Sequence, residues 1–438
     1  MKYLSTFRLP IIVSAVVVSL SFFQIVPGQE MDGIERGRMK DMLKVVKDEV
    51  KKNYYDTNYH GINLDEKFKV AEEKLAAAKT SSQALAIIAQ VLMDFNDSHL
   101  FLIPPSTNLA VEYGWRMSAI GDKVYVTHVK PGSDAEAKGL KPGDQILSIG
   151  GFKPNKKELW KIKYYYNQIG KRTSLVLNVL SPGEDAPKIF DIKSQIKTLP
   201  RAISFSSYFR LFDNFYDEEN DKHRFWSYGN TLIWRMPSFE FDPSTVDGLM
   251  ERARNSQNLI LDLRGNGGGY VKTLEALASN FFDKDVKIAD LKGRKVMDPI
   301  LAKARGKAKF GGRVIVLVDS ESGSAAEIFA RVMQIEQRGK VLGDVSAGAV
   351  MQSISRDFQL GTQSVVPFAV SVTNADVIMT DGKSLEHTGV IPDETVIPTG
   401  ADLAATRDPV IVRALEMLGG KITPEEAGKL VKYYWKKD

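Results

Sequence analysis

No cysteine occurs in this chain of 438 residues. This absence excludes disulfide bonds, a thiol nucleophile, lipid attachment through cysteine and zinc sites built from thiolates. Histidine is scarce, with only five in the whole sequence, so chemistry that needs an imidazole has few candidates. The net charge is only +5, and no concentrated basic stretch with interleaved aromatic residues is present. Nucleic-acid binding is therefore not expected.

The length, with 43% hydrophobic and 26% charged residues, is typical of a globular protein of two or three domains. At the N-terminus, Lys2 and Arg8 accompany an apolar stretch from Leu9 to Phe23, and Gly28 marks a candidate cleavage site. This pattern predicts a secretory signal peptide over residues 1–28, too short for a comfortable membrane span. Because no A-x-A-like site is evident, a retained N-terminal anchor is the alternative. Both interpretations place the body of the chain in the periplasm or outside the cell.

Residues 29–106 carry the periodicity of amphipathic helices. One apolar stripe includes Met42 and Val46, and a second includes Ile88 and Leu92. A turn-rich connection separates the two stripes. The pattern predicts a small N-terminal helical domain whose stripes form its own core.

The next segment changes to short strands and turns. VYVTHV, residues 124–129, alternates with the period of a strand, and PGSDAEAKGLKPGDQILSIGG follows at residues 131–151. Within it, Ser133 can cap a short helix, Gly139 can end that helix, and LKPGD turns into the strand QILSI.

This succession resembles a PDZ domain, which we assign to residues 107–185. The resemblance implies that an extended peptide, usually its C-terminal end, is bound by addition as a strand beside a groove. A PDZ domain that only packs against or gates another domain is the alternative. The carboxylate-binding loop and the groove strand would be formed by Tyr113, Gly114, Trp115 and Arg116.

The second half alternates strands and helices, which predicts an α/β core over residues 186–438. Its strands include LILDL and VIVLV, with the helix VKTLEALASNFF between them. An aromatic-rich, charged segment in residues 200–236 has no evident chemistry, and we interpret it as a mobile surface excursion before the strand NTLIWRMP.

Ser324 lies in RVIVLVDSESGSAAEIFARVMQ, between an apolar strand and an amphipathic helix. With Glu327 it fits a capping box, in which a hydroxyl and a carboxylate satisfy the free N–H groups of a helix start. Most serines in such a position are only caps. A nucleophilic serine would in addition need a base and an oxyanion hole elsewhere in the chain.

The sequence contains a candidate for the oxyanion hole. NLILDLRGNGGGY, residues 258–270, is a buried strand that runs into a glycine-rich turn. Such a turn can present backbone N–H groups with no side chains in the way. A phosphate-binding loop is the competing interpretation, but the Gly-Lys-Ser/Thr ending and the G-x-G-x-x-G spacing are both missing. A purely structural turn is the other alternative.

A candidate base is His99, in FNDSHLFLIPP, between a helix and an apolar strand. Its neutral imidazole is a natural proton acceptor for a serine near neutral pH. Glu386, in SLEHTGVIPDETV, is a candidate for the carboxylate that orients the base, and His387 beside it is a reserve candidate for the base. Taken alone, His99 is more readily explained as a surface or satisfied histidine and Glu386 as a surface glutamate.

Taken together and in this order, these motifs resemble the serine peptidase family that includes the C-terminal processing peptidases and the tricorn protease core. The resemblance spans the D-x-H segment, the PDZ pattern, LDLRGNGGG, GSAAE, GDVSAG and E-x-x-GV-x-PD. It implies a ClpP/crotonase-like α/β peptidase core, with an N-terminal helical domain and an inserted PDZ domain. It also implies a nucleophilic role for Ser324.

One departure from the family pattern concerns the base. Where the processing peptidases carry a catalytic lysine, the matching segment GDVSAGAVMQ has Ala349, and the nearby Lys340 does not match that position. The tricorn-like branch pairs its serine with a histidine instead. Similarity to that branch implies Ser324 as nucleophile and His99 as base, with Ser98 and Glu386 completing the tetrad and Gly268 and Ala325 supplying oxyanion N–H groups.

The resulting hypothesis is an exported serine peptidase of the endopeptidase or carboxyl-terminal processing type, acting on polypeptides without a metal or organic cofactor. We expect no nucleic-acid partner and no stable membrane span after signal cleavage, and the sequence does not define the oligomeric state. A catalytically inactive scaffold or binding protein on the same fold is the main alternative, because the lysine is missing and Ala326 replaces a frequent second serine. Binding of an apolar small molecule is a third.

Overall fold

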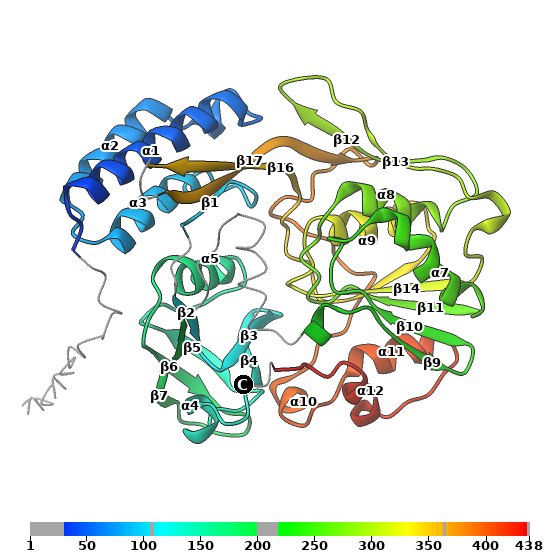
Figure 1. The fold of residues 1–438 in the computed structure, drawn as a ribbon. Helices are drawn as coiled ribbons and strands as arrows, with labels where there is room; N and C mark the ends of the chain where they lie inside the picture. The colour runs from blue at the N-terminus through cyan, green and yellow to red at the C-terminus, as the bar shows by residue number, and fades with distance from the viewer. Residues whose placement is uncertain (1–29, 106–108, 199–217, 362–364, 436–438) are drawn as a thin grey trace, which may run out of the picture.

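The computed structural model describes residues 30–105, 109–198, 218–361 and 365–435. The predicted signal peptide and residues 200–217 of the predicted excursion lie outside these ranges. The prediction of an excursion is wrong for residues 224–228, which form a strand of the core sheet because they pair with residues 231–235. Figure 1 shows three parts: N-terminal helices, a smaller β domain and a larger α/β core. No helix within the described ranges is both long and apolar enough to cross a membrane.

The N-terminal part consists of three helices whose predicted apolar stripes are buried against one another. Each helix begins after a side chain that accepts a hydrogen bond from a backbone N–H group of the first turn: Asp32, Asn63 and Thr80, respectively. These helices are α1 (Gly33–Asn53), α2 (Leu64–Ala77) and α3 (Ser81–Met93).

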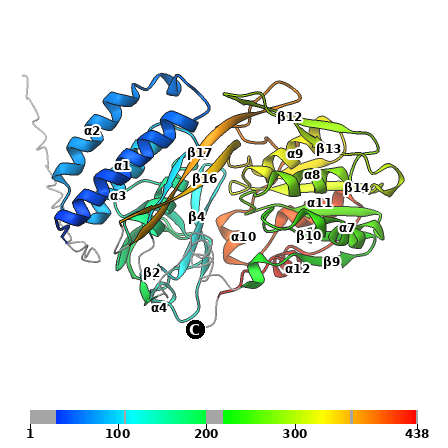
Figure 2. The same cartoon turned by 45° about the horizontal axis from the view of Figure 1, so that its top comes forward.

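A long antiparallel hairpin joins these helices to the core. Its second strand, β17 (Val366–Met379), packs Phe368 and Val370 against the helices and Val377 and Met379 into the core. Figures 1 and 2 show this hairpin running across the molecule between the two parts. Its sheet has the order β1-β17-β12-β13, with β16 also paired to β17. The other strands are β1 (Phe101–Ile103), β12 (Val286–Gly293), β13 (Ile300–Ala302) and β16 (Met351–Leu360).

The smaller domain is an antiparallel sheet of five strands in the order β3-β4-β5-β6-β7. The predicted short helix is confirmed as α4 (Asp134–Ala137), capped by Ser133. Strand β3 lies at the edge of the sheet, and a second helix, α5 (Leu159–Tyr164), follows β5. The strands are β3 (Trp115–Ile120), β4 (Lys123–Val129), β5 (Gln145–Ile149), β6 (Ser174–Leu180) and β7 (Lys188–Lys193), with a separate pair β2 (Leu109–Glu112) and β8 (Gln195–Thr198).

The larger core is a six-stranded sheet in the order β18-β15-β14-β11-β10-β9, covered by helices on both faces (Figure 1). All neighbouring strands are parallel except β9 and β10. The strands are β9 (Arg224–Tyr228), β10 (Thr231–Arg235), β11 (Asn258–Asp262), β14 (Arg313–Val318), β15 (Lys340–Gly343) and β18 (Glu394–Thr395). The helices are α7 (Val246–Arg254), α8 (Val271–Ser279), α9 (Ala325–Ile335), α10 (Gly400–Ala404), α11 (Pro409–Met417) and α12 (Pro424–Leu430).

The two faces of this sheet are apolar, as expected for parallel strands buried on both sides. Alternate residues of each strand point to opposite faces: Val314 and Val316 pack toward α7, α8 and α9, whereas Ile315 and Leu317 pack toward α11. The parallel neighbours β11 and β14 end side by side, with Asp262 opposite Leu317. The glycine-rich turn and the Ser324 turn therefore leave the sheet at the same edge.

Phe281, which follows α8, packs in this core away from the strand ends, and its substitution tests how much the core contributes to stability. Its ring is fully buried and lies 5.5 Å from the ring of Phe329 and 6.2 Å from that of Phe310. Phe281→Ala should lower the free energy of unfolding by about 3–5 kcal/mol, because a cavity replaces the ring. Urea unfolding followed by circular dichroism measures this change. Val296→Ala, at a fully exposed side chain, is the control, and equal midpoints for the two variants would contradict the prediction.

Candidate active site

The glycine-rich turn after β11 and the Ser324 turn after β14 are in direct contact. The Gly323 N–H donates to the Asn266 carbonyl at 2.9 Å. A Cβ added to Gly268 would lie 2.5 Å from the Ser324 Cβ and 2.9 Å from the Ala325 nitrogen, so only glycine fits there. The backbone of Gly268, with a φ of +99°, therefore lies against both Ser324 and the first residue of helix α9.

Ser324 has a strained backbone that helix capping does not require. Its φ is +53° and its ψ is −119°, a combination that is unfavourable for any residue with a Cβ. Thr80 and Thr423 also stand in capping boxes of this chain, yet their φ values are −124° and −76°, in the ordinary extended region. Strain of this kind persists where the surrounding structure enforces it, and it is concentrated at functional sites. Helix capping therefore does not explain the backbone conformation of Ser324.

Glu327 holds the Ser324 turn in place. Its carboxylate is fully buried and accepts the Ser324 N–H at 3.0 Å, as the capping box predicts. It also accepts hydrogen bonds from the Ser346 hydroxyl at 2.6 Å, the Gly348 N–H at 2.8 Å and the Ala349 N–H at 3.0 Å. In return, the Ala349 carbonyl accepts the Ser324 N–H at 2.9 Å. Glu327 thus joins the Ser324 turn to the loop 346–350.

The candidate base and its two partners form one hydrogen-bonded chain. The Ser98 hydroxyl lies 2.8 Å from His99 Nδ1 and donates to Glu386 Oε2 at 2.9 Å. Glu386 also accepts the Ser98 N–H at 2.9 Å and the Val350 N–H at 2.8 Å. The structure therefore brings His99, Ser98 and Glu386 together, although residues 98–99 and 386 are far apart in the sequence.

The same loop connects this chain to Ser324. The Val350 N–H donates to Glu386, while the carbonyl of the preceding residue, Ala349, accepts the Ser324 N–H. In the described part of the chain, however, no hydrogen bond joins Ser324 to His99 directly.

Asp97 is a positioning residue that the sequence patterns did not single out. Its buried carboxylate accepts the His99 N–H at 2.9 Å and the Thr373 hydroxyl at 2.7 Å through one oxygen, and the Tyr54 hydroxyl at 3.0 Å through the other. Tyr54 directly follows helix α1 and Thr373 belongs to β17. Asp97 thus fixes the backbone of His99 to the helical part and to the long hairpin. In the sequence, only the D-x-H spacing could have indicated a role for Asp97.

Burial and charge shift the protonation equilibria of the site. Burial lowers the pKa of His99 below its usual value, and the negative charge of Asp97 opposes this shift only in part. Burial also raises the pKa of Glu386, against the hydrogen bonds from Ser98 and Val350, and Asp97 adds to the rise. Both shifts favour a neutral imidazole near neutral pH.

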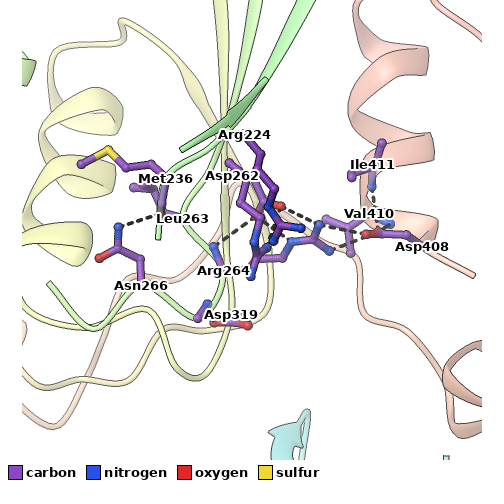
Figure 3. A network of polar contacts seen from close by, with 12 residues as sticks. Arg224, Met236, Asp262, Leu263, Arg264, Asn266, Asp319, Asp408, Val410 and Ile411 are labelled. Atoms are coloured by element: carbon purple, nitrogen blue, oxygen red, sulfur yellow. Dashed lines mark hydrogen bonds and ion pairs between the residues drawn. The ribbon is translucent and has the colours of Figure 1, made fainter. Parts of the chain in front are cut away.

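A buried ion network behind the glycine-rich turn keeps that turn in position (Figure 3). Arg264 contacts Asp262 and Asp408 at 2.8 Å each, and Asp408 caps helix α11. Burial would raise the pKa of Asp262, but the charges of Arg264 and Arg235 lower it to about 2. Asp262 is therefore ionised at all ordinary pH values.

The side chains of Asp319 and Asn266 hold the glycine-rich turn itself. Asp319 Oδ1 accepts the Gly265 N–H at 2.9 Å, and the Asn266 amide donates to the Met236 carbonyl at 2.9 Å (Figure 3). The Asn266 amide oxygen accepts the Gly268 N–H at 2.9 Å. In this state the Gly268 N–H group is therefore engaged within the turn.

The four residues predicted for peptide binding are split between the domain core and its surface. Tyr113 and Trp115 pack into the hydrophobic core of the β domain. Gly114 has a φ of +74°, and a Cβ there would lie 2.6 Å from the Ser133 Cβ, so this position requires glycine. Arg116 instead lines a cavity between the β domain and the α/β core.

The remaining candidates lie around the site or away from it. His387, the reserve candidate, has a half-exposed ring with Nε2 at 3.6 Å from Glu386 Oε1. His60, His128 and His223 make their hydrogen bonds to other groups. Lys340 is exposed at the start of β15. Within the described ranges, no three histidine, aspartate or glutamate side chains cluster as a metal site would need.

A strained serine lies at a strand-to-helix turn beside a glycine turn, and loop 346–350 links it to a histidine that is supported by a carboxylate. These are the groups that serine hydrolases use. Residues 230–396 match the sequence model of Peptidase family S41, and residues 111–158 match that of the PDZ domain. The chain therefore contains a peptidase S41 domain and a PDZ domain, as the family resemblance predicted.

Comparisons with individual proteins agree with this assignment. The chain is 28% identical over 263 residues to a tail-specific protease of Haemophilus influenzae, an alignment that covers 58% of this chain and 36% of that protein. It is 25% identical over 295 residues to a carboxyl-terminal-processing protease of Synechocystis, covering 66% of this chain and 64% of that protein. The chain thus spans only about a third to two thirds of the length of these curated relatives.

Solved structures show the same fold. Mature CPAF superposes with a TM-score of 0.64 at 15% identity, over 85% of this chain and 94% of that chain. The predicted fold class, an α/β peptidase core with an N-terminal helical region and a PDZ domain, is confirmed.

The buried carboxylate of Glu327 makes the stability of the protein depend on pH. Burial raises the pKa of Glu327 from 4.5 to about 7, against the four hydrogen bonds that it accepts. The stability contributed by this group is fully present below pH 4.5 and is lost as the pH rises through about 7. Between pH 4.5 and pH 8, the free energy of unfolding of wild type should therefore fall by up to about 3 kcal/mol more than that of Glu327→Gln.

Urea unfolding of both proteins at pH 4.5, 6 and 8 measures this difference. Glu336→Gln, at the end of the same helix, is the control and should follow wild type at each pH. Parallel stability curves for wild type and Glu327→Gln would show that Glu327 does not titrate in this range.

Proposed function

We propose that this protein is a serine peptidase of the carboxyl-terminal processing type, with Ser324 as nucleophile and His99 as general base. The observation that carries the proposal is the strained Ser324 turn, which loop 346–350 connects to the hydrogen-bonded chain of Glu386, Ser98 and His99. Polypeptides are the proposed substrates, in keeping with the names of the curated relatives.

The hydrogen-bonded chain selects the tautomer of His99 that can act as a base. The Ser98 hydroxyl donates its proton to Glu386, so its lone pair accepts a proton from His99 Nδ1. A neutral imidazole with its proton on Nδ1 has an unprotonated Nε2. His99 Nε2 is then the atom that takes the proton from the Ser324 hydroxyl.

The reaction follows in two halves. The Ser324 Oγ attacks the peptide carbonyl carbon as its proton passes to His99, and the tetrahedral intermediate collapses when His99 gives that proton to the leaving amine. Water then attacks the acyl ester by the same proton route, which releases the carboxylic acid and restores Ser324. Glu386 and Ser98 hold the imidazole in place and stabilise its positive charge.

The N–H groups of Ala325 and Gly268 are the proposed oxyanion donors. Both belong to the contact between the two turns. The Gly268 N–H would have to exchange its bond with Asn266 for one to the oxyanion when substrate binds. Catalytic hydrogen bonds are often loose in a substrate-free enzyme, which also fits the absence of a direct Ser324–His99 bond in the described chain.

Ala349 contributes through its backbone in this scheme. It stands where the family resemblance places a lysine, and its N–H and carbonyl groups both hold the Ser324 turn, directly or through Glu327. We further propose that the protein acts outside the cytoplasm, on the basis of the signal-like N-terminal sequence. The inactive scaffold is the second candidate, and the same missing lysine favours it.

Labelling by a serine-reactive fluorophosphonate separates an active enzyme from an inactive scaffold. Wild type should be labelled, and both Ser324→Ala and His99→Ala should lose labelling and lose hydrolysis of unfolded polypeptide by about 10⁴-fold or more. Ser322→Ala is the matched control for a neighbouring serine, whose hydroxyl is bonded to the Leu263 carbonyl at 2.8 Å. Unlabelled wild type, or labelled Ser324→Ala, would contradict the nucleophile assignment.

The pH dependence of turnover identifies the base. Because only neutral His99 can accept a proton and burial lowers its pKa below 6.5, kcat/KM should rise with pH below that value and then reach a plateau. Asp97→Asn removes a negative charge that raises the pKa of His99, so its rising limb should move to still lower pH. A rate that rises only above about pH 8 would point to a lysine base instead.

A further inference from the structure

The glycine-rich turn has a neighbour on each side. Ser324, after β14, lies against one side of Gly268, and segment 238–240, after β10, lies against the other, in keeping with the strand order β14-β11-β10. The Gly268 carbonyl accepts the Phe239 N–H at 2.7 Å and the Ser238 hydroxyl at 3.2 Å. The proposed oxyanion turn therefore lies between this segment and the proposed nucleophile.

Glu240 brings a carboxylate to this place without a partner for its charge. Its Cγ would lie 2.9 Å from a Cβ added to Gly269, so the side chain begins directly beside the turn. Although the residue as a whole is exposed, partial burial of the carboxyl group raises the pKa of Glu240, and among the described residues no hydrogen bond or positive charge acts against this rise. Lys272, the first basic residue after the turn, is paired with Glu275 at 2.8 Å instead.

The ring of Tyr270 lies next to this carboxylate. Phe239 and Gly269 form a parallel bridge, and the Tyr270 N–H donates to the Phe239 carbonyl at 3.2 Å. In a parallel pair, residues opposite each other point to the same face, so the next two residues, Glu240 and Tyr270, share a face. Tyr270 is 59% exposed. A free carboxylate and an accessible aromatic ring thus lie side by side, and both attract cations.

A negative charge at this place opposes the proposed reaction unless it is neutralised. The tetrahedral intermediate carries a negative oxygen at the glycine-rich turn, and a nearby carboxylate raises its energy. A positively charged substrate side chain bound to Glu240 would remove this penalty and add its own attraction. The same carboxylate would repel an acidic side chain, so it discriminates in both directions.

We propose that Glu240 and Tyr270 form a subsite for a lysine or arginine side chain next to the scissile bond, and that the peptidase therefore prefers basic sequences. The carboxylate pairs with the cation, and the ring of Tyr270 packs against it. Both residues determine specificity and take no part in the bond changes. The cleavage preference rests on the proposed function, whereas binding of a basic chain does not need catalysis.

Binding is tested by fluorescence anisotropy in the Ser324→Ala background, which prevents cleavage. Three labelled ten-residue peptides with blocked ends differ only in a central lysine, norleucine or glutamate. The lysine peptide should bind about fivefold more tightly than the norleucine peptide, as expected for a partly exposed ion pair with an aromatic contact. Adding Glu240→Gln should abolish this preference, and Glu240→Lys should reverse it toward glutamate. Glu251→Gln, at an exposed glutamate of α7, is the control and should retain it.

Cleavage is tested with Ser324 intact, by mass spectrometry of the products of an unfolded polypeptide. Wild type should cleave bonds flanked by lysine or arginine most often, and Glu240→Gln should lose this enrichment. Because it also removes a negative charge beside the oxyanion, Glu240→Gln should cleave the norleucine peptide at least as fast as wild type. Tyr270→Leu should weaken the enrichment, and Tyr270→Phe should keep it, since the aromatic face is retained.

The outcomes separate the subsite from the proposed function. An equal loss of rate by Glu240→Gln on the lysine and norleucine peptides would give Glu240 a merely structural role and overturn the proposal. Equal binding of the lysine and norleucine peptides by Ser324→Ala would overturn it as well. If wild type cleaves no polypeptide, the proposed function fails, while the binding preference still decides whether Glu240 and Tyr270 hold a cation.

Discussion

Two carboxylates bind the same short loop from two directions, and the arrangement of the site depends on this constraint. Glu327 accepts hydrogen bonds from residues 346, 348 and 349, and Glu386 accepts one from Val350. Glu327 also holds Ser324, and Glu386 holds Ser98 beside His99. Because both carboxylates are hydrogen-bonded to one short segment, that segment links the Ser324 turn to the turn that carries His99. Without this loop, these hydrogen bonds would no longer link Ser324 to the chain of Glu386, Ser98 and His99.

The cost of burying these charges is offset by dense hydrogen bonding. An isolated carboxylate in such a place would be strongly unfavourable, and four donors around Glu327 compensate only partly, as its raised pKa shows. The Arg264 network shows the opposite balance, since Arg264 and Arg235 keep Asp262 ionised. Asp262 is therefore ionised at all ordinary pH values, whereas the pKa of Glu327 is raised to about 7.

Several features could be predicted because their signals are local. The strands around VIVLV and LILDL, the cap at Ser133 and the glycine at position 268 follow from apolar runs, capping chemistry and backbone geometry within short windows. The role of Asp97 could not be predicted from the D-x-H spacing alone, because its partners Tyr54 and Thr373 come from distant elements. The contact of Glu321 with Lys163 joins two domains, and neither residue has a local pattern that announces it.

The sequence by itself determined which chemical groups are available: no thiol, five histidines, a glycine-rich turn after one apolar run, three serines (Ser320, Ser322 and Ser324) after another, and an alanine where the family resemblance places a lysine. It also determined the elements that carry them, because apolar periodicity and caps act over a few residues. Only the tertiary structure decided that His99 is supported by Glu386 through Ser98, and that Ser324 is strained and joined to them by a loop. The physical reason is that hydrogen bonds between distant segments depend on how sheets and hairpins pack, which no local pattern encodes.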